Sequence, residues 1–146
     1  MTTSEAAYVA GIVDGEGTIN IAEGWCARKR GNSYHPRLSV GSTSKKLVDC
    51  LIRVFGGRST ARKVPSNPKA KDQWCWYLNG YEAVTLLLEI RPFLVIKPLQ
   101  ANLVLAVPRF REFTGKRARG RNWTPTELAQ GAEAYACMHR LNKRGR

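Results

Sequence analysis

The sequence is poor in acidic residues and has no long apolar run. Asp and Glu number 11 against 24 Lys and Arg, which gives the 146 residues a formal net charge of +13 and a pI near 10.1. No apolar run approaches the ~18–20 residues of a membrane-spanning helix, and the basic residues are scattered rather than gathered on one amphipathic face. A membrane partner is therefore disfavoured, and the positive charge points first to nucleic acid. The simpler alternative is that the positive charge serves only to keep the protein soluble.

Cysteine and histidine are also scarce, which narrows the chemistry. No two cysteines form a CxxC pair, and the chain has only two histidines, so a zinc site is disfavoured. Neither histidine stands in a motif with a nucleophilic Ser or Cys. A chain of this length builds a core without disulfides, so we expect four reduced thiols: Cys26, Cys50, Cys75 and Cys137.

The N-terminal residues bear on the location of the protein. The N-terminus runs from polar residues directly into a patterned segment, so we expect no signal peptide. We therefore predict an intracellular protein, in the cytoplasm, the nucleoid or an organelle, and not a secreted one. We also expect no small-molecule cofactor.

The hydrophobic residues, 43% of the chain, are enough for one domain over residues 1–146. Their spacing predicts helices at 4–14, 45–55, 81–90, 98–107 and 125–141, and strands at 18–22, 37–41, 58–64 and 73–78. Ser4 and Ser44 are the predicted caps of the first two helices. The prediction is an α+β fold with an αββαββα core over about residues 4–108. A four-stranded antiparallel sheet carries helices on one face, and a basic linker and a last helix occupy about residues 114–146.

The uncovered face of such a sheet must meet solvent or a ligand. Strand alternation places on it side chains that can contact base edges and phosphates: Asn20, Arg37, Ser39, Arg58, Thr60 and Arg62. Two basic loops add candidate phosphate contacts: Arg28, Lys29, Arg30, Lys116 and Arg119. In the fourth strand, alternation leaves open whether Trp74 and Trp76 or Cys75 and Tyr77 face the ligand.

The first helix ends in a distinctive run, VAGIVDGEG over residues 9–17, preceded by Tyr8. Its small residues would let a second helix approach closely. Its two carboxylates, Asp14 and Glu16, stand at a helix C-terminus, where the dipole disfavours negative charge unless a cation is bound. A second segment, RPFLVIK over residues 91–97, precedes QANL over residues 100–103. Together with the order of elements, both segments resemble the LAGLIDADG homing endonuclease family, of the type with one motif per chain, over residues 5–108.

The resemblance implies a homodimer in which the first helices of two subunits meet. The implied interface residues are Ala7, Ala10, Gly11 and Asp14. It also implies Glu16 as the catalytic, metal-binding acid, the Gly15 carbonyl as a second metal ligand and Lys97 as the basic residue near the scissile phosphate. The implied cofactor is Mg²⁺, with Mn²⁺ as a substitute.

The implied reaction is double-strand cleavage of a long, roughly palindromic DNA site across the minor groove, leaving 3′ overhangs. A polar residue at the end of the second strand, Ser42 or Thr43, is implied to hold active-site water, and Ser42 joins the predicted DNA contacts. An intron-borne or free-standing gene is expected.

Two alternatives remain open from the sequence. One is a LAGLIDADG nucleic-acid binder that does not cut, such as an RNA splicing maturase. The other is a basic structural protein that binds nucleic acid without chemistry and has no need of Glu16. The presence of Glu16, which relatives that do not cut can lose, favours the cutting enzyme.

Overall fold

The computed structural model describes residues 1–26, 31–62, 72–112 and 122–143. The elements, in chain order, are α1 (Thr3–Glu16), β1 (Gly17–Cys26), β2 (Gly31–Ser42), α2 (Lys45–Phe55), β3 (Arg58–Arg62), β4 (Gln73–Asn79), α3 (Tyr81–Ile90), η2 (Arg91–Phe93), α4 (Pro98–Ala106), α5 (Pro108–Arg111) and α6 (Pro125–Lys143). The predicted α+β fold and its αββαββα order are confirmed. The short helices η2 and α5 were not predicted, because three or four residues are too few to show a helical period.

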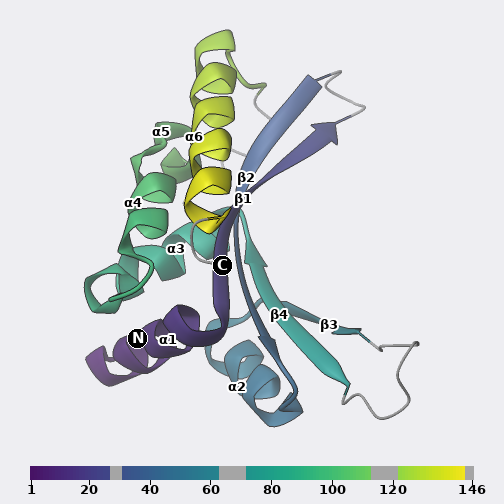
Figure 1. Ribbon diagram of the computed structural model, residues 1–146, viewed down its shortest axis with the longest axis vertical. Helices are drawn as coiled ribbons and strands as arrows, with labels where there is room; N and C mark the ends of the chain where they lie inside the picture. Colours follow the sequence, from purple (N-terminus) through teal and green to yellow (C-terminus); the bar gives the residue numbers. More distant parts are fainter. Residues whose placement is uncertain (27–30, 63–71, 113–121, 144–146) are drawn as a thin grey trace.

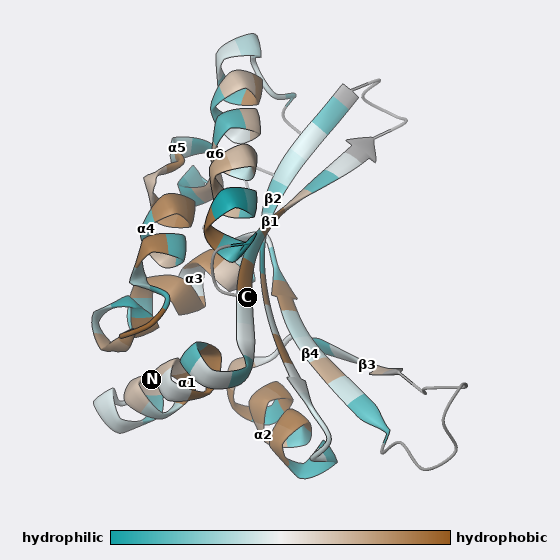
Figure 2. Ribbon diagram, viewed as in Figure 1, coloured by the Kyte–Doolittle hydropathy of each residue, from teal (hydrophilic) through white to brown (hydrophobic). Residues whose placement is uncertain are grey.

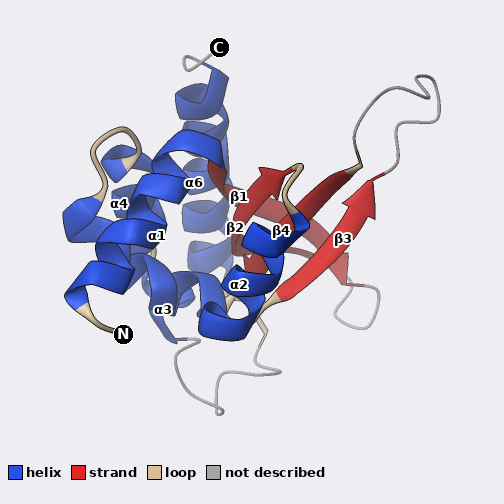
Figure 3. Ribbon diagram, turned by 90° about the horizontal axis from the view of Figure 1, so that it is seen from below, coloured by secondary structure: helices blue, strands red, loops and turns tan. Residues whose placement is uncertain are grey.

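The four strands form one antiparallel sheet in the order β1-β2-β4-β3. The helices lie on one side of it, and the sheet curves away from them, so its open face is concave (Figures 1 and 3). The β1–β2 pair is longer than predicted, since it continues to the Cys26–Gly31 pair. This extension carries polar residues on both faces, with Asn32 Nδ2 donating to Glu23 Oε1 at 2.8 Å, so no one-sided apolar pattern marks it.

The core lies between the sheet and the helices, and both layers carry stretches of hydrophobic residues (Figure 2). Alternate residues of three strands are at most 1% exposed: Ile19, Ile21, Leu38, Val40, Trp76 and Leu78. Trp76 also donates from Nε1 to the Gly56 carbonyl at 2.8 Å, which satisfies the one polar atom of its ring. The question left open for β4 is therefore answered. Trp76 belongs to the core, and Cys75 and Tyr77 lie on the open face.

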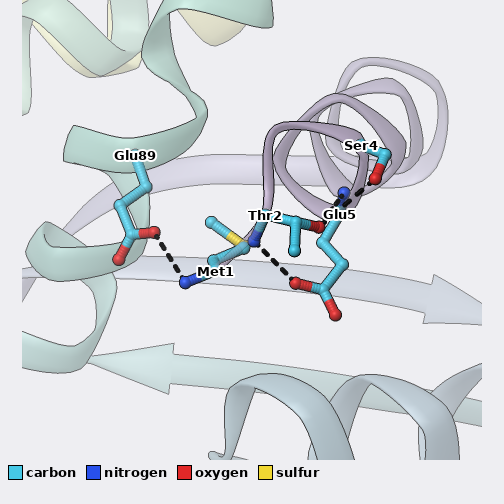
Figure 4. Close-up of polar contacts among 5 residues, drawn as sticks. All are labelled: Met1, Thr2, Ser4, Glu5 and Glu89. Atoms are coloured by element: carbon cyan, nitrogen blue, oxygen red, sulfur yellow. Dashed lines mark hydrogen bonds and ion pairs between the residues drawn. The ribbon is translucent and has the colours of Figure 1, made fainter.

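The N-terminus of α1 is capped by Thr2 and not by the predicted Ser4 (Figure 4). Glu5 N donates to Thr2 Oγ1 at 3.2 Å, and Thr2 N donates to Glu5 Oε2 at 2.8 Å, which completes a capping box. These bonds hold the pKa of the Glu5 carboxyl below its usual value. The Met1 ammonium lies 3.8 Å from Glu89 of α3. Thr2 prevails because only it has a Glu three residues ahead.

The last helix, α6, is packed into the same core as the other helices. Ala134 and Met138 are buried with residues of the sheet and of α4. A Cβ at Gly131 would lie 2.5 Å from the Tyr34 ring of β2, so only glycine lets α6 approach the sheet this closely. Asn142 Nδ2 reaches the Ile19 carbonyl at 3.1 Å. The helix therefore covers the β1–β2 pair, and Leu128 N donates to the Thr124 carbonyl at its predicted start.

Candidate active site and nucleic-acid face

The predicted motif places its two carboxylates where α1 passes directly into β1. Gly17 makes this passage possible, because a Cβ there would lie 2.7 Å from both Cα and O of Val13. Gly15 and Glu16 are exposed at this junction, and Asp14 is only 8% exposed. Thr18, two residues after Glu16, is exposed and pairs with Ser39 of β2. The Glu16 carboxylate therefore adjoins the start of the open face.

Asp14 and Lys97 hold the end of α1 against the segment that precedes α4. The Asp14 carboxylate accepts from Val95 N at 2.7 Å and from Lys97 N at 3.0 Å. In return, Lys97 Nζ donates to the Val13 carbonyl at 2.9 Å and to the Asp14 carbonyl. A cation here is favourable, because the last carbonyls of a helix carry partial negative charge. The sequence predicted Lys97 as the basic residue near the scissile phosphate, and that role stays a prediction. It did not predict that the Lys97 ammonium caps the end of α1.

The residues at this helix end suit a hard divalent cation. Glu16 is exposed, and it has no hydrogen-bond or ion-pair partner within the described part of the chain. The donors offered at the junction are a carboxylate and backbone carbonyls, all oxygen ligands of the kind that Mg²⁺ takes. Lys97 shows that this end attracts positive charge. No three His, Cys, Asp or Glu side chains gather anywhere in the described residues. A metal at this junction would therefore be held by Glu16 and backbone carbonyls, with further ligands from phosphate, water or another subunit.

The outer face of α1 is made of small residues. Ala7, Gly11 and Gly15 are exposed and follow one another at a spacing of four residues. A Cβ at Gly11 or Gly15 would meet nothing within 4 Å, so these glycines are not required by the packing of one chain. Two predicted interface residues lie elsewhere. Ala10 is fully buried in the core, and the Asp14 carboxylate bonds to the segment that precedes α4 in its own chain.

The open face carries polar side chains in rows that run across the strands. Opposed residues of an antiparallel pair share a face, so the registers define the rows. One row is Thr18, Ser39, Tyr77 and Arg58; the next is Asn20, Arg37 and Asn79; a third is Gly41, Cys75 and Thr60. The predicted alternation thus brings Asn20, Arg37, Ser39, Arg58 and Thr60 onto one surface. Arg62 pairs with Gln73 at its margin, and its side chain is outside the described part.

Solved structures share the fold of this chain. The chain matches the homing endonuclease I-CvuI, solved in complex with the I-CreI target in 2 mM Mg with the DNA not cleaved, at a TM-score of 0.70 and 21% identity over 94% of this chain and 82% of that one. The archaeal intron-encoded homing endonuclease I-Vdi141I, complexed with DNA, matches at 0.68 and 14% over 94% and 84%. The LAGLIDADG homing endonuclease I-GzeII, in complex with a DNA target, matches at 0.63 and 12% over 90% and 43%.

The chain has the LAGLIDADG homing endonuclease fold. At these identities the likeness concerns the fold. The chain spans most of I-CvuI and I-Vdi141I and under half of I-GzeII, and its length suits a domain with one motif. No model of a protein family matches the sequence, and no curated protein matches it.

Ser42 differs from its prediction within the LAGLIDADG fold. It pairs with Trp74, so alternation places it on the helix-covered face and not on the open one. Its hydroxyl accepts from Ser44 N at 3.0 Å and so supports the turn into α2. The parity of β2 decides this, because Leu38, Val40 and Ser42 share one face.

Several predicted contacts cannot be placed in the LAGLIDADG fold. They lie outside the described residues: Arg28, Lys29, Arg30, Lys116 and Arg119. In the parts that are described, Cys50, Cys75 and Cys137 are free thiols, as expected. None of the described helices is both long and apolar enough to span a bilayer.

Two residues of the open face were missed by sequence reasoning. Tyr77 lies under Arg37, whose guanidinium carbon is 4.8 Å from the ring centroid, and this cation–π contact orients the guanidinium over the sheet. His35, in β2, is partly buried, and this burial, with the positive charge of Arg37 second, lowers the pKa of its imidazole below the usual value. Alternation from Arg37 could have found His35. Tyr77 needed the choice of face on β4, which alternation leaves open.

Proposed function

We propose that this protein is a site-specific double-strand DNA endonuclease that acts as a homodimer with Mg²⁺ and cuts a long, roughly palindromic site. The observation that carries the proposal is the position of Glu16. It is an exposed carboxylate without a partner in the described residues, at a helix end that attracts cations, beside the start of a concave face rich in Arg, Asn, Ser and Thr. An intracellular location, where DNA lies, belongs to the same proposal.

Each group at the junction has a separate part in the proposed cleavage. Glu16 and the Gly15 carbonyl would hold Mg²⁺, or Mn²⁺ in its place. When bound, the metal would supply Lewis-acid activation of water and charge stabilisation at phosphorus. The Lys97 ammonium is bonded to the Val13 and Asp14 carbonyls at the same helix end, from where it would stabilise the extra charge of a pentavalent phosphate. The buried Asp14 carboxylate is not a metal ligand here, since both its oxygens accept backbone N–H groups.

The homodimer is supported by the outer face of α1 and by the segment beside it. The small residues at positions 7, 11 and 15 would allow two helices to pack with their backbones close together. Next to the end of α1, Val95, Ile96 and Leu99 are 84%, 69% and 62% exposed. Apolar side chains exposed this far are typical of a surface that a partner covers. A two-fold axis along α1 would bring two Glu16 carboxylates together, one for each DNA strand.

The DNA contact is supported by the charge and by the shape of the sheet. The open face is concave and presents Arg37 and Arg58 among amide and hydroxyl side chains. A dimer would double the net charge of +13. With roughly 6–10 phosphates neutralised, affinity would fall by about 10³–10⁵ between 50 and 200 mM salt. Strong salt dependence is therefore part of the proposal.

The test is selection of cut sites from a randomised duplex library. The unmodified protein and the Glu16→Gln variant are incubated with the library in Mg²⁺, with Ca²⁺ and chelator lanes in parallel, and the cut ends are sequenced. We expect one recurring, near-palindromic site with 3′ overhangs, cut only by the unmodified protein with Mg²⁺. Glu16→Gln keeps the size of the side chain and removes its charge, so its folding and DNA binding serve as the control.

A LAGLIDADG binder that does not cut, such as an RNA maturase, is the alternative. Tight DNA or RNA binding with no cleavage in Mg²⁺ or Mn²⁺, and no effect of Glu16→Gln, would replace the nuclease proposal by this one.

A further inference from the structure

The two carboxylates of the motif differ sharply in their surroundings. Glu16 is exposed. Asp14 is only 8% exposed, and both of its carboxylate oxygens accept hydrogen bonds from the segment that leads into α4. We propose that Asp14 is a positioning residue for cleavage. By fixing the backbone of Val95 and Lys97, it places the Lys97 ammonium beside the Glu16 junction. This inference rests on the proposed function, because it concerns the same site.

The segment between η2 and α4 has few other attachments. Leu94 is buried, and Leu94 N donates to the Arg91 carbonyl at 3.3 Å. The next two side chains, Val95 and Ile96, are 84% and 69% exposed and so add little packing within one chain. The backbone of this segment bonds to the motif through two N–H groups, which donate to the Asp14 carboxylate at 2.7 and 3.0 Å. The position of Lys97 within a subunit therefore depends on Asp14.

The contacts between Asp14 and Lys97 are reciprocal. The side chain of Asp14 holds the backbone of Lys97, and the side chain of Lys97 holds the backbone of Asp14. Each charge compensates the other at a helix end where the carboxylate alone would be unfavourable. If Asp14 is lost, two backbone donors lose their acceptor and the Lys97 side chain loses a fixed origin. The long Lys side chain would then sample many rotamers and reach its catalytic place only part of the time.

The experiment is a double-mutant cycle on single-turnover cleavage of the selected site in Mg²⁺. Its members are the unmodified protein, Asp14→Asn, Lys97→Met and the double variant. We expect each single change to slow cleavage by about 10–100-fold. The double variant should be no slower than Lys97→Met, since Asp14 acts only through Lys97. DNA affinity, measured in Ca²⁺, should stay within about 3-fold in all four proteins, a result that general loss of structure would not give.

A second pair of variants tests the same contact without touching the acid. Val95→Pro deletes the N–H that bonds to Asp14, and the extended backbone of Leu94, at φ −74° and ψ 129°, suits a residue before proline. Val95→Ala removes the same exposed side chain but keeps the N–H. We expect Val95→Pro to slow cleavage by about 3–10-fold relative to Val95→Ala, with DNA affinity unchanged.

The outcomes separate the two proposals. If the unmodified protein does not cut, the proposed function fails, and the positioning role falls with it. If the unmodified protein cuts but the effects of Asp14→Asn and Lys97→Met multiply, Asp14 does not act through Lys97 and the positioning role alone is overturned. The same holds if Val95→Pro and Val95→Ala cut equally fast. These last two results leave the nuclease proposal standing.

Discussion

The two faces of the sheet carry opposite chemistries on the same strands. On β4, Trp76 is fully buried under the helices, and the next residue, Tyr77, lies on the open face beneath Arg37. On β2, Leu38 is fully buried between Arg37 and Ser39, both of which lie on the open face. Neighbouring residues of one strand thus have different roles: one packs in the core, and the next lies on the face that is open to a ligand. Substitutions on the covered face should therefore mainly lower stability, and substitutions of exposed residues on the open face should mainly change DNA binding.

The largest effect is expected at Trp76. Its replacement by alanine removes a fully buried indole and its bond to the Gly56 carbonyl. We expect Trp76→Ala to lower the free energy of unfolding by about 3–5 kcal/mol, the usual cost of a large core truncation. Urea unfolding followed by circular dichroism measures this cost. Tyr77→Ala is the matched control, and a loss there as large as at Trp76 would contradict the separation of the two faces.

The next effect is expected at Arg37, on the open face. Arg37→Ala should weaken DNA binding by about 1–3 kcal/mol and reduce its salt dependence, as loss of one charged groove contact does. The free energy of unfolding should change by no more than about 0.5 kcal/mol. Binding titrations at several salt concentrations give both quantities.

Tyr77 supplies the control for this effect. Tyr77→Phe keeps the ring under the guanidinium and should bind DNA almost as the unmodified protein does, whereas Tyr77→Leu should lose part of the Arg37 contribution. If both variants bind alike, the ring does not orient Arg37.

A smaller effect is expected on α1, which shows the same division on a helix. Ala10 is buried, while Gly11 is exposed with nothing within 4 Å of an added Cβ. Gly11→Ala should raise the stability of one subunit by up to about 1 kcal/mol, because alanine is the better helix former. In the proposed dimer the same methyl group would separate the two helices, so self-association should weaken. Sedimentation at several concentrations tests this. Thr85→Ala, on the exposed side of α3, is the control and should leave self-association unchanged.

These divisions show what the sequence could predict. Strand alternation predicted the open face at Asn20, Arg37 and Ser39, because the residues between and beside them are apolar and the period is two. It left β4 undecided, since both sets of that strand are aromatic or apolar, and only the bond from Trp76 to Gly56 and the packing of α2 choose the buried one.

At the candidate site, the resemblance marked Glu16 and Lys97, and the structure places both residues at the end of α1. Their predicted roles stay predictions. Of the predicted interface residues, Ala10 is buried and Asp14 bonds within its own chain, and a pattern of small and acidic residues along one helix does not reveal which of them are buried. The bonds of Asp14 to Val95 and Lys97 join residues 81 and 83 positions apart, and no local pattern encodes such a contact.

The smallest effect concerns His35, the open-face residue that is partly buried. Burial, and then the charge of Arg37, lower the pKa of its imidazole below 6.5, so the folded protein favours the neutral ring. Between the unfolded and the folded pKa, the unfolded chain binds the extra proton. The stability that His35 contributes is therefore fully present above pH 6.5 and is lost as the pH falls through the folded pKa.

His35→Gln should flatten this part of the pH profile. We expect the urea midpoint of the unmodified protein to fall more between pH 7.5 and 5 than that of the variant. His139→Gln, at an exposed position of α6, is the control. If the urea midpoint falls equally in all three proteins, burial does not lower the pKa of His35. A flattened profile in the His35→Gln variant would instead show that His35 is partly shielded from water. The open face of β2 would then exclude water beside Arg37 even without bound DNA.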